Sequence, residues 1–335
     1  MRLGTMKMNA IRNMALVFAA MAISAVQASA VPTGHFERTL KVSGQVDMEI
    51  NSGSGNVTVH AGPSDTVQIN AKIHGSRNGT SWLFGDGDVE EKIRKIEQNP
   101  PVRQQGNMIV VGRVEDRELL RNVSIDYDVT VPAQTKLLSQ TGSGDQTING
   151  LQQSLTAKTG SGNITLENIG AETRVHTGSG DLKINSVKGN LFADTGSGNI
   201  RAYGVGGEID AHTGSGDVEM HQVAAGDIKV GTGSGNVKLQ GIKGGLRAQT
   251  GSGDIQAEGE ATRDWRLGAG SGNITLKLPT QASFDLDART SSGTLKVSHP
   301  ITYEGGISKN HIHGKVNNGG VALDLHTGSG DIYIE

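Results

Sequence analysis

Apolar residues recur two positions apart through residues 137–297, and the pattern returns about every 18 residues. Each unit contains a pair of apolar positions, a short Gly-Ser-Gly segment and a second apolar pair. Alternation with a period of two predicts a strand with one buried face. Because glycine permits the backbone angles of a sharp corner, each unit predicts a strand, a corner, a second strand and a turn.

The corner segment marks the repeat most clearly. Thr-Gly-Ser-Gly followed by Asp or Asn begins at Thr141, Thr159, Thr177, Thr195, Thr213, Thr232, Thr250 and Thr327, and degenerate copies begin at Ser52, Ala269 and Thr290. A short fixed period is typical of a solenoid. We therefore expect an all-β fold, a single-stranded parallel β-helix with coils of ~18 residues stacked about 4.8 Å apart.

The predicted core is a set of apolar columns, each contributing one residue per coil. Two columns lie four and two residues before the threonine of the corner. A third column lies directly after the Asp or Asn, and a fourth lies two residues further on. A fifth column lies in the following turn and contains Leu151, Ile169, Val187, Val205, Val223 and Ile242. One coil alone buries too little apolar surface to offset its ordering entropy, so neighbouring coils must stack.

Residues 1–30 have the pattern of a secretory signal peptide. Arg2, Lys7 and Arg12 form a basic start, an apolar run extends from Met14 to Val26, and the small residues 28–30 suit a signal peptidase. A membrane anchor needs an apolar run of about 20 residues, which is longer than this one. We expect cleavage before Val31, and no membrane span after it.

The segments on either side of the array differ from it, as caps would. Residues 31–136 combine a half-coil around Ser52 with further strands and a helix at 88–98, which the pair Asn99-Pro100 ends. Residues 298–335 contain an insertion with a hairpin or loop at 298–320 and a last half-coil. The array proper is expected at 137–297, with both flanking regions covering its strand edges.

Charge and cysteine content exclude several classes of protein. The chain has 31 basic and 34 acidic residues, and removal of three basic residues with the signal peptide gives a net charge of about −6. That charge disfavours binding to nucleic acid. The absence of cysteine excludes disulfide frameworks and thiolate metal sites.

Three places in the sequence contain residues that could carry chemistry. Calcium-binding β-rolls also turn in 18 residues, but here the Asp comes once per coil and alternates with Asn, which favours a structural corner. His176, Asp194 and His212 occupy one outward column and could hold zinc, yet a surface ladder is the simpler interpretation. A second outward column is a charge-alternating surface, with Arg201, Glu219 and Lys238.

No catalytic, cofactor-binding or metal-binding residue is assigned. The turns of the array are too short for the grooves of polysaccharide-cleaving β-helices. The Gly-Ser-Gly corners are not phosphate loops, because no lysine follows them and no helix begins there. The sequence therefore indicates a protein that is not an enzyme and has no cofactor.

The residue that ends each corner alternates strictly. Through eight coils it is Asp145, Asn163, Asp181, Asn199, Asp217, Asn236, Asp254 and Asn273. If the coils stack, interleaved Asn separates the carboxylates and lowers their mutual repulsion. The alternative is the duplication of an ancestral unit of 36 residues, with an alternation that has no physical consequence.

The signal peptide, the early Ser-Gly-Ser-Gly-Asn half-coil, the strand at 123–132 and the Thr-Gly-Ser-Gly array together resemble a known bacterial family. It is a domain-of-unknown-function family of exported β-strand-repeat proteins, described as candidate adhesins. The resemblance covers about residues 36–335 and implies a β-helix outside the cytoplasm, periplasmic or at the cell surface.

Two hypotheses for the function follow. The first is a monomeric interaction protein that binds an envelope or surface component, protein or polysaccharide. The second is a structural or self-assembling envelope scaffold, in which coil ends stack into longer rods. Irregular segments at both ends of the array favour the first hypothesis.

Overall fold

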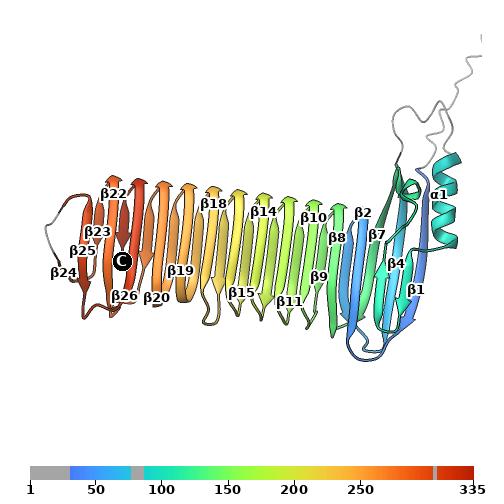
Figure 1. Cartoon of the computed structure of the whole chain (residues 1–335), viewed down its shortest axis with the longest axis horizontal. Helices are drawn as coiled ribbons and strands as arrows, with labels where there is room; N and C mark the ends of the chain where they lie inside the picture. Colours follow the sequence, from blue (N-terminus) through green and yellow to red (C-terminus); the bar gives the residue numbers. More distant parts are fainter. Residues whose placement is uncertain (1–30, 77–86, 305–307) are drawn as a thin grey trace, which may run out of the picture. The chain divides into compact units, whose positions relative to one another are not determined.

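The computed structural model describes residues 31–76, 87–304 and 308–335. Within these residues the chain winds into a long solenoid of parallel strands (Figure 1). They include one α-helix, α1 (Gly87–Gln98), and a 3-10 helix at Arg117–Leu120. The predicted all-β parallel β-helix with one short helix is thus confirmed, whereas the predicted signal peptide lies outside the described residues.

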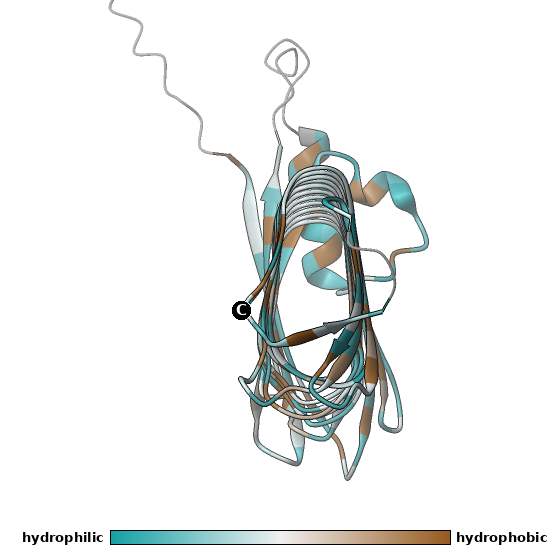
Figure 2. Ribbon diagram, turned by 90° about the vertical axis from the view of Figure 1, so that its left-hand side faces the viewer, coloured by the Kyte–Doolittle hydropathy of each residue, from teal (hydrophilic) through white to brown (hydrophobic). Residues whose placement is uncertain are grey.

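Each rung of the solenoid is a narrow loop of two strands. Viewed along the axis in Figure 2, the rungs superpose, with closely overlaid corners at the top and more variable turns at the bottom. The overlaid corners are the Gly-Ser-Gly segments, because the strands that lead into them end at their serine. The two strands of each rung belong to two sheets that face each other across the core.

The first sheet contains the strands that lead into the corners. In spatial order it consists of β5 (Val102–Gln105), β6 (Met108–Val111), β2 (Val46–Ser54), β8 (Thr135–Ser143), β10 (Leu155–Ser161), β12 (Thr173–Ser179), β14 (Leu191–Ser197), β16 (Ile209–Ser215), β18 (Ile228–Ser234), the second halves of β19 (Val237–Ser252) and β20 (Ile255–Ser271), β26 (Val321–Ser329), β22 (Phe284–Ser292), β25 (His311–Val316) and β24 (Ile301–Tyr303).

The second sheet contains the strands that leave the corners. Its order is β1 (Thr33–Lys41), β4 (Thr66–Gly75), β7 (Val123–Pro132), β3 (Val57–Gly62), β9 (Gln146–Asn149), β11 (Ile164–Ile169), β13 (Leu182–Val187), β15 (Ile200–Val205), β17 (Val218–Gln222), the first halves of β19 and β20, β21 (Ile274–Lys277), β27 (Ile332–Ile334) and β23 (Leu295–Val297).

The repeat sets the strand register. The corner threonines of successive rungs pair directly, as Thr159 does with Thr177 and Thr177 with Thr195. A strand of period two buries alternate residues, so this register places each predicted apolar column in the core. Leu155 and Leu191, for example, are 1% and 0% exposed.

The fifth column contains one wrong prediction. Val223 was expected in the core, but it is 57% exposed, and Gln222 takes the buried place opposite Val205. The step to the next corner is one residue longer here, and the register shifts after Tyr203. The Gln222 amide compensates for its burial by donating to the carbonyls of Gly207 and Gly226, at 3.0 and 3.1 Å.

The corners bring the backbones of successive rungs into close contact. A Cβ on Gly180 would collide with the carbonyl of Gly162 one rung away, and the same contact recurs along the array. Only glycine fits where one backbone approaches another this closely. The buried threonines use the same contact: Thr195 Oγ1 donates to the Gly180 carbonyl at 3.0 Å. Ala269 is the one position of the array, within the described rungs, that lacks this donor.

A second ladder runs along the residues that end the corners. The backbone N–H of each donates to the side-chain oxygen of the residue one rung before it; Asn199 donates to Asp181 at 2.8 Å, and Asp217 donates to Asn199 at 2.9 Å. The amide of Asn199 also donates to Asp181, at 3.3 Å. In spatial order the ladder is Asp126, Asn56, Asp145, Asn163, Asp181, Asn199, Asp217, Asn236, Asp254, Asn273, Asp331 and the Thr294 N–H.

This ladder alternates by position in space and not by position in the chain. Asn56 lies between Asp126 and Asp145, although β2 and β3 are far from β8 in sequence. At the other end Asp331 follows Asn273, although the chain continues first to the rung at 284–297. Duplication of neighbouring units does not account for residues that fit the alternation out of chain order. Separation of carboxylates on adjacent rungs does account for them.

Neither end of the solenoid follows chain order. At the start, the half-coil β2–β3 lies between β8–β9 and a rung formed by β6 and β7. At the other end, the rung β26–β27 lies between β20–β21 and β22–β23. The sequence repeat did not predict that β26–β27 would lie between these two rungs. The corner motif indicates that a coil is present, but it does not indicate which coil lies next to it.

Antiparallel strands flank the parallel rungs. β4 and β1 extend the second sheet beyond β7, and β25 and β24 extend the first sheet beyond β22. Helix α1 packs beside β1 and β4 through its buried residues Ile93 and Ile96 (Figure 1). The helix predicted at 88–98 is thus present.

We expect Asn199→Asp to destabilise the protein by about 1–2 kcal/mol at pH 7 and low salt. The change places three carboxylates on adjacent rungs and removes the amide donor to Asp181. Urea-induced unfolding at low and high salt measures the effect, which should shrink as salt screens the charges. Asp217→Asn is the control, because it keeps the oxygen acceptor and removes a charge. Equal stability of the Asn199 variant and the wild type would contradict the charge interpretation.

The threonine ladder gives a second pair of variants. Thr195→Val removes the hydroxyl donor and leaves the Gly180 carbonyl without it, so we expect a loss of about 1–2 kcal/mol. Ala269→Thr supplies the missing donor at a position where other rungs already hold threonine, so we expect a gain of about 0.5–1 kcal/mol. Urea-induced unfolding of both variants checks the signs, and a loss from Ala269→Thr would refute the role of the hydroxyl.

Candidate functional site

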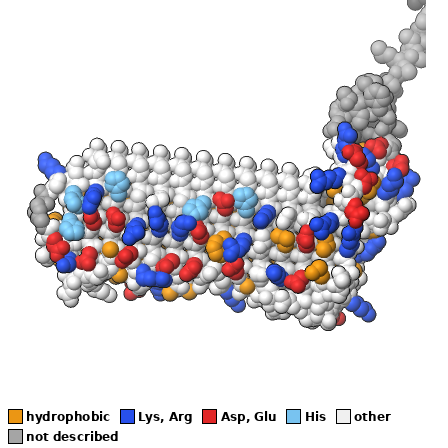
Figure 3. Space-filling view, viewed as in Figure 1, with side chains coloured by type: hydrophobic (Ala, Val, Ile, Leu, Met, Phe, Trp, Pro, Cys, Tyr) orange, Lys and Arg blue, Asp and Glu red, His pale blue; other side chains and the backbone are white. Residues whose placement is uncertain are grey.

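The outward surface of the first sheet, from β12 to β25, carries most of the polar clusters of the solenoid, and we call it the polar face. Figure 3 shows both charges spread over this side of the molecule and an upper edge without charged side chains. Two columns of outward residues form it. The lower column is Arg174, Phe192, Asp210, Lys229, Arg247, Arg266, Asp324, Asp287 and His313; the upper column is His176, Asp194, His212, Gly231, Gln249, Gly268, His326, Arg289 and His311.

The predicted ladder of His176, Asp194 and His212 forms only in part. His176 Nδ1 lies 2.9 Å from Asp194, but His212 turns to Asp210 on its own strand, at 2.7 Å. The two histidines therefore do not share a carboxylate. In the ranges that the structure describes, no group of three or more His, Asp or Glu residues is placed to hold a metal ion.

Next to these residues the polar face holds charged and aromatic contacts. The guanidinium of Arg174 stacks on Phe192, 3.9 Å from the ring centre. Lys229 Nζ pairs with Asp210 at 3.2 Å. Such exposed contacts each contribute little to stability, so they leave the side chains available to a ligand.

Two grooves lie on the polar face between β14 and β26. One has a volume of about 470 Å³ and follows the lower column from Phe192 to Arg266. The other has a volume of about 510 Å³ and follows the upper column from Gly231 to His326. Both are open to solvent, and both run across the rungs along the axis of the solenoid.

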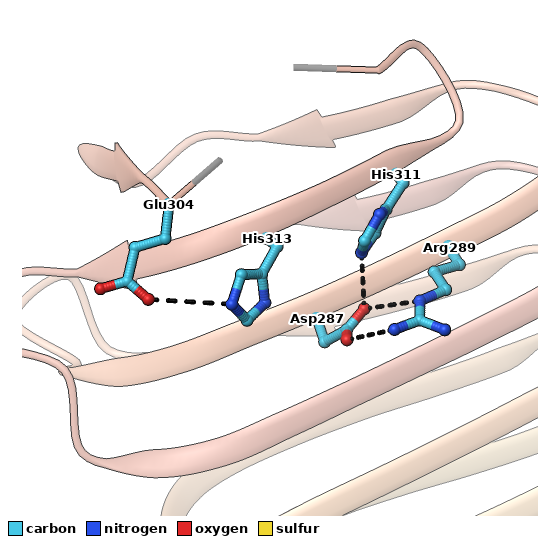
Figure 4. Close-up of polar contacts among 5 residues, drawn as sticks. All are labelled: Asp287, Arg289, Glu304, His311 and His313. Carbon is cyan, nitrogen blue, oxygen red and sulfur yellow. Dashed lines mark hydrogen bonds and ion pairs between the residues drawn. The ribbon is translucent and has the colours of Figure 1, made fainter. Parts of the chain in front are cut away.

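A polar cluster lies at the far end of the same face, where β25 joins the sheet antiparallel to β22 (Figure 4). Asp287 accepts two hydrogen bonds from Arg289, at 2.6 and 2.9 Å, and one contact from His311 at 3.0 Å. Beside it, Glu304 pairs with Lys315 at 2.7 Å and lies 3.7 Å from His313.

The carboxylates of this cluster are held in their charged form. Partial burial opposes ionisation of Asp287, but hydrogen bonds from Arg289 and His311 outweigh it and lower the pKa of Asp287. The hydrogen bond and charge of Lys315 lower the pKa of Glu304. A buried acid that is kept protonated is typical of acid catalysis, and these two groups are the opposite case.

The repeat pattern did not predict this cluster. Its histidines lie in the segment 298–320, where the repeat is interrupted, and β25 pairs antiparallel to its neighbour. The alternation of His311, His313 and Lys315 with Ile312 and Gly314 was the available signal, since it predicts a strand with one polar face.

On the second sheet the predicted charge-alternating column is partly formed. Lys238 pairs with Glu219 at 3.1 Å, and hydrogen bonds from Lys238 and Tyr203 lower the pKa of Glu219. Arg201 makes no ion pair among the described residues. The described part of the chain also contains no helix long and apolar enough to cross a membrane.

Comparison with known proteins gives a family. The family model described as Toastrack DUF4097 matches residues 41–205 and again residues 174–335. Together the two matches extend over most of the chain, from the half-coil β2–β3 to β27. A search of the curated proteins finds no match.

Two solved structures resemble the chain at low sequence identity. One is a "putative cell adhesion protein" from Clostridium sporogenes, 12% identical, covering 90% of this chain and 99% of its own, with a TM-score of 0.21. The other is a "putative adhesin" from Bacteroides fragilis, 13% identical, covering 90% of this chain and 97% of its own, with a TM-score of 0.25.

The Asp287 cluster predicts a pH-dependent contribution to stability. A carboxyl whose pKa is lowered in the folded state stabilises the fold above its unfolded pKa of about 3.9, and loses that contribution as pH falls through the folded pKa. We therefore expect Asp287→Asn to cost about 1 kcal/mol at pH 6–7 and nothing near pH 2. Thermal unfolding between these pH values measures the difference.

Asp324→Asn is the matched control, because Asp324 lies on the next rung of the same column and accepts no hydrogen bond among the described residues. It should change stability by little at any of these pH values. A cost of Asp287→Asn that does not depend on pH would contradict the assignment.

Proposed function

This chain belongs to the Toastrack DUF4097 family, and on that basis we propose that it is an exported, non-enzymatic β-solenoid that binds an envelope or cell-surface component on its polar face. The partner is a protein or a polysaccharide and not a nucleic acid. The protein acts as a monomer, in the periplasm or at the cell surface, and needs no cofactor.

The observation that carries the proposal is a contrast within each rung. Corner residues repeat almost unchanged along the solenoid, and inward residues are nearly all apolar, because stacking requires both. Outward residues at one position differ from rung to rung: Arg174, Phe192, Asp210, Lys229 and Arg247 follow one another. A scaffold that only stacked would gain nothing from this variety, whereas a repeat protein that binds a ligand places its specific side chains on one such surface.

The rigidity of the scaffold supports the same conclusion. Backbone ladders, the threonine bonds and the Asp/Asn ladder hold every rung of the array at a fixed spacing. Outward side chains on such a scaffold need little reordering to meet a ligand that extends along the axis. Preorganisation of this kind lowers the entropic cost of binding.

The alternative of a self-assembling scaffold is less well supported. Antiparallel strands flank the parallel rungs at both ends, as β1 and β4 do at one end and β24 and β25 at the other. We propose that residues 31–136 and 298–335 supply the caps around the array at 137–297, although β26 and β27 themselves form a rung within the stack. Capped edges disfavour end-to-end pairing of strands.

The absence of cysteine allows a direct test of the polar face. Gln249→Cys lies on the polar face and Gln256→Cys on the second sheet, and both glutamines are exposed. Each variant is labelled with a bulky polyethylene glycol maleimide and mixed with isolated cell envelopes. We expect saturable binding that the label at 249 blocks and the label at 256 does not.

Two results would count against the proposal. If unlabelled protein does not bind envelopes saturably, the binding function is wrong. If both labels block equally, the polar face is not the binding surface. Cell fractionation with mass spectrometry of the mature N-terminus tests export separately, and we expect a chain that begins at Val31 outside the cytoplasm.

A further inference from the structure

Two arginines on the polar face have no partner. Arg247 and Arg266 pair across neighbouring rungs, so their Cα atoms are about 4.8 Å apart, and both side chains are exposed. Neither guanidinium has a hydrogen bond or an ion pair among the described residues. Like charges directly opposite each other in a sheet destabilise it. Asp324 lies beside Arg266 on the next rung but forms no ion pair with it.

Apart from Asp324, two acidic side chains near these arginines already have partners. Asp264 precedes Arg266 by two residues and accepts the N–H of Ala322 at 3.0 Å. Asp227 holds Arg263 at 2.8 Å and accepts the N–H of Gly245 at 2.6 Å. Among the carboxylates that line the groove of the lower column, Glu208 and Asp264 have no side-chain partner in the described chain.

On the other side of the arginines the upper groove contains no acidic residue. Its floor includes Gly268, two residues after Arg266 on the same outward face. The backbone of Gly268 does not have a positive φ, and a Cβ there would meet open space. Neither conformation nor packing therefore requires glycine at this strand position, where it weakens the sheet. Because Gly268 has no side chain, space for a ligand remains above it.

Two polar side chains border this floor. Gln249 follows Arg247 by two residues, and His326 lies on the next rung beside Gly268. Both are exposed and have no hydrogen-bond partner in the described structure. The upper groove thus has a volume of about 510 Å³, a floor that contains glycine, and polar side chains without partners. Positively charged side chains lie along one side of it (Figure 3).

We propose that Arg247, Arg266 and the groove over Gly268 bind an acidic polysaccharide, with carboxylates of successive sugars on the two guanidiniums. This inference rests on the proposed function and specifies its ligand. The planar guanidinium matches a carboxylate through two parallel hydrogen bonds. Gln249 and His326 are placed to bond sugar hydroxyls above the glycine floor.

The groove suits a sugar chain better than an acidic peptide. The peptide groups of the floor are already paired within the parallel ladders, so a peptide strand could not add to the sheet face. A sugar chain needs only a flat floor and side-chain partners. A sugar chain that carries many carboxylates and extends along the axis can meet both arginines.

The test uses purified protein and four soluble polymers in a binding titration at low salt. Polygalacturonate supplies sugar carboxylates, its methyl ester supplies the same chain without charge, dextran is neutral, and polyglutamate supplies carboxylates on a peptide chain. We expect polygalacturonate to bind at least tenfold more tightly than any of the other three. Equal binding of polyglutamate would overturn the choice of a polysaccharide.

Variants locate the site. We expect Arg247→Gln with Arg266→Gln to weaken polygalacturonate binding at least tenfold, and Gly268→Gln, which fills the floor, to weaken it severalfold. The control is Lys183→Gln with Lys296→Gln, two exposed lysines of the second sheet, which removes the same charge and should change binding less than twofold. Thermal unfolding confirms that all variants fold.

Equal losses in the arginine and lysine variants would refute the site, because they would show binding through net charge alone. The envelope experiment separates this failure from that of the proposed function. If the wild type and the double arginine variant bind envelopes equally, this site is wrong and the binding function stands. If the wild type binds neither envelopes nor polygalacturonate, both are wrong.

Discussion

The contact between successive corners is the constraint on which the rest of the structure depends. Backbones approach so closely at Gly-Ser-Gly that a side chain at Gly180 would displace the next rung. Once that contact is made, the threonine hydroxyl and the oxygen of the Asp or Asn lie within reach of backbone groups one rung away. The corner therefore fixes the distance between successive rungs. That distance in turn aligns the apolar columns and the hydrogen-bond ladders of the strands.

This dependence explains which parts of the fold could be predicted. The motif from Thr141 to Thr250 combines spacing, apolar parity and glycine placement, and each points to the same coil. Where the period lengthened by one residue, as before Thr232, alignment of the fifth column assigned Val223 to the core and was wrong. The pairing of β26 between β20 and β22 could not be predicted either, because every coil presents the same edge to its neighbours.

On the polar face, the positions of side chains could be predicted from the sequence, but their partners could not. Column position predicted that His176, Asp194 and His212 point outward, but not that His212 would choose Asp210, since a side chain selects among partners within reach. The unpaired state of Arg247 and Arg266 could not be predicted at all. It depends on where the neighbouring carboxylates of Asp227 and Asp264 are already committed, and only the folded molecule determines that.

The position of β26 and β27 also bears on the order in which the molecule can assemble. Most rungs can add one at a time from the N-terminal side, each stacking on the rung already formed. The rung at 284–297 cannot, because its neighbour in the stack consists of residues 321–335, which emerge later. The native order of rungs after β21 therefore forms only once those residues are present. A chain cut short before them lacks the rung on which β22 and β23 stack.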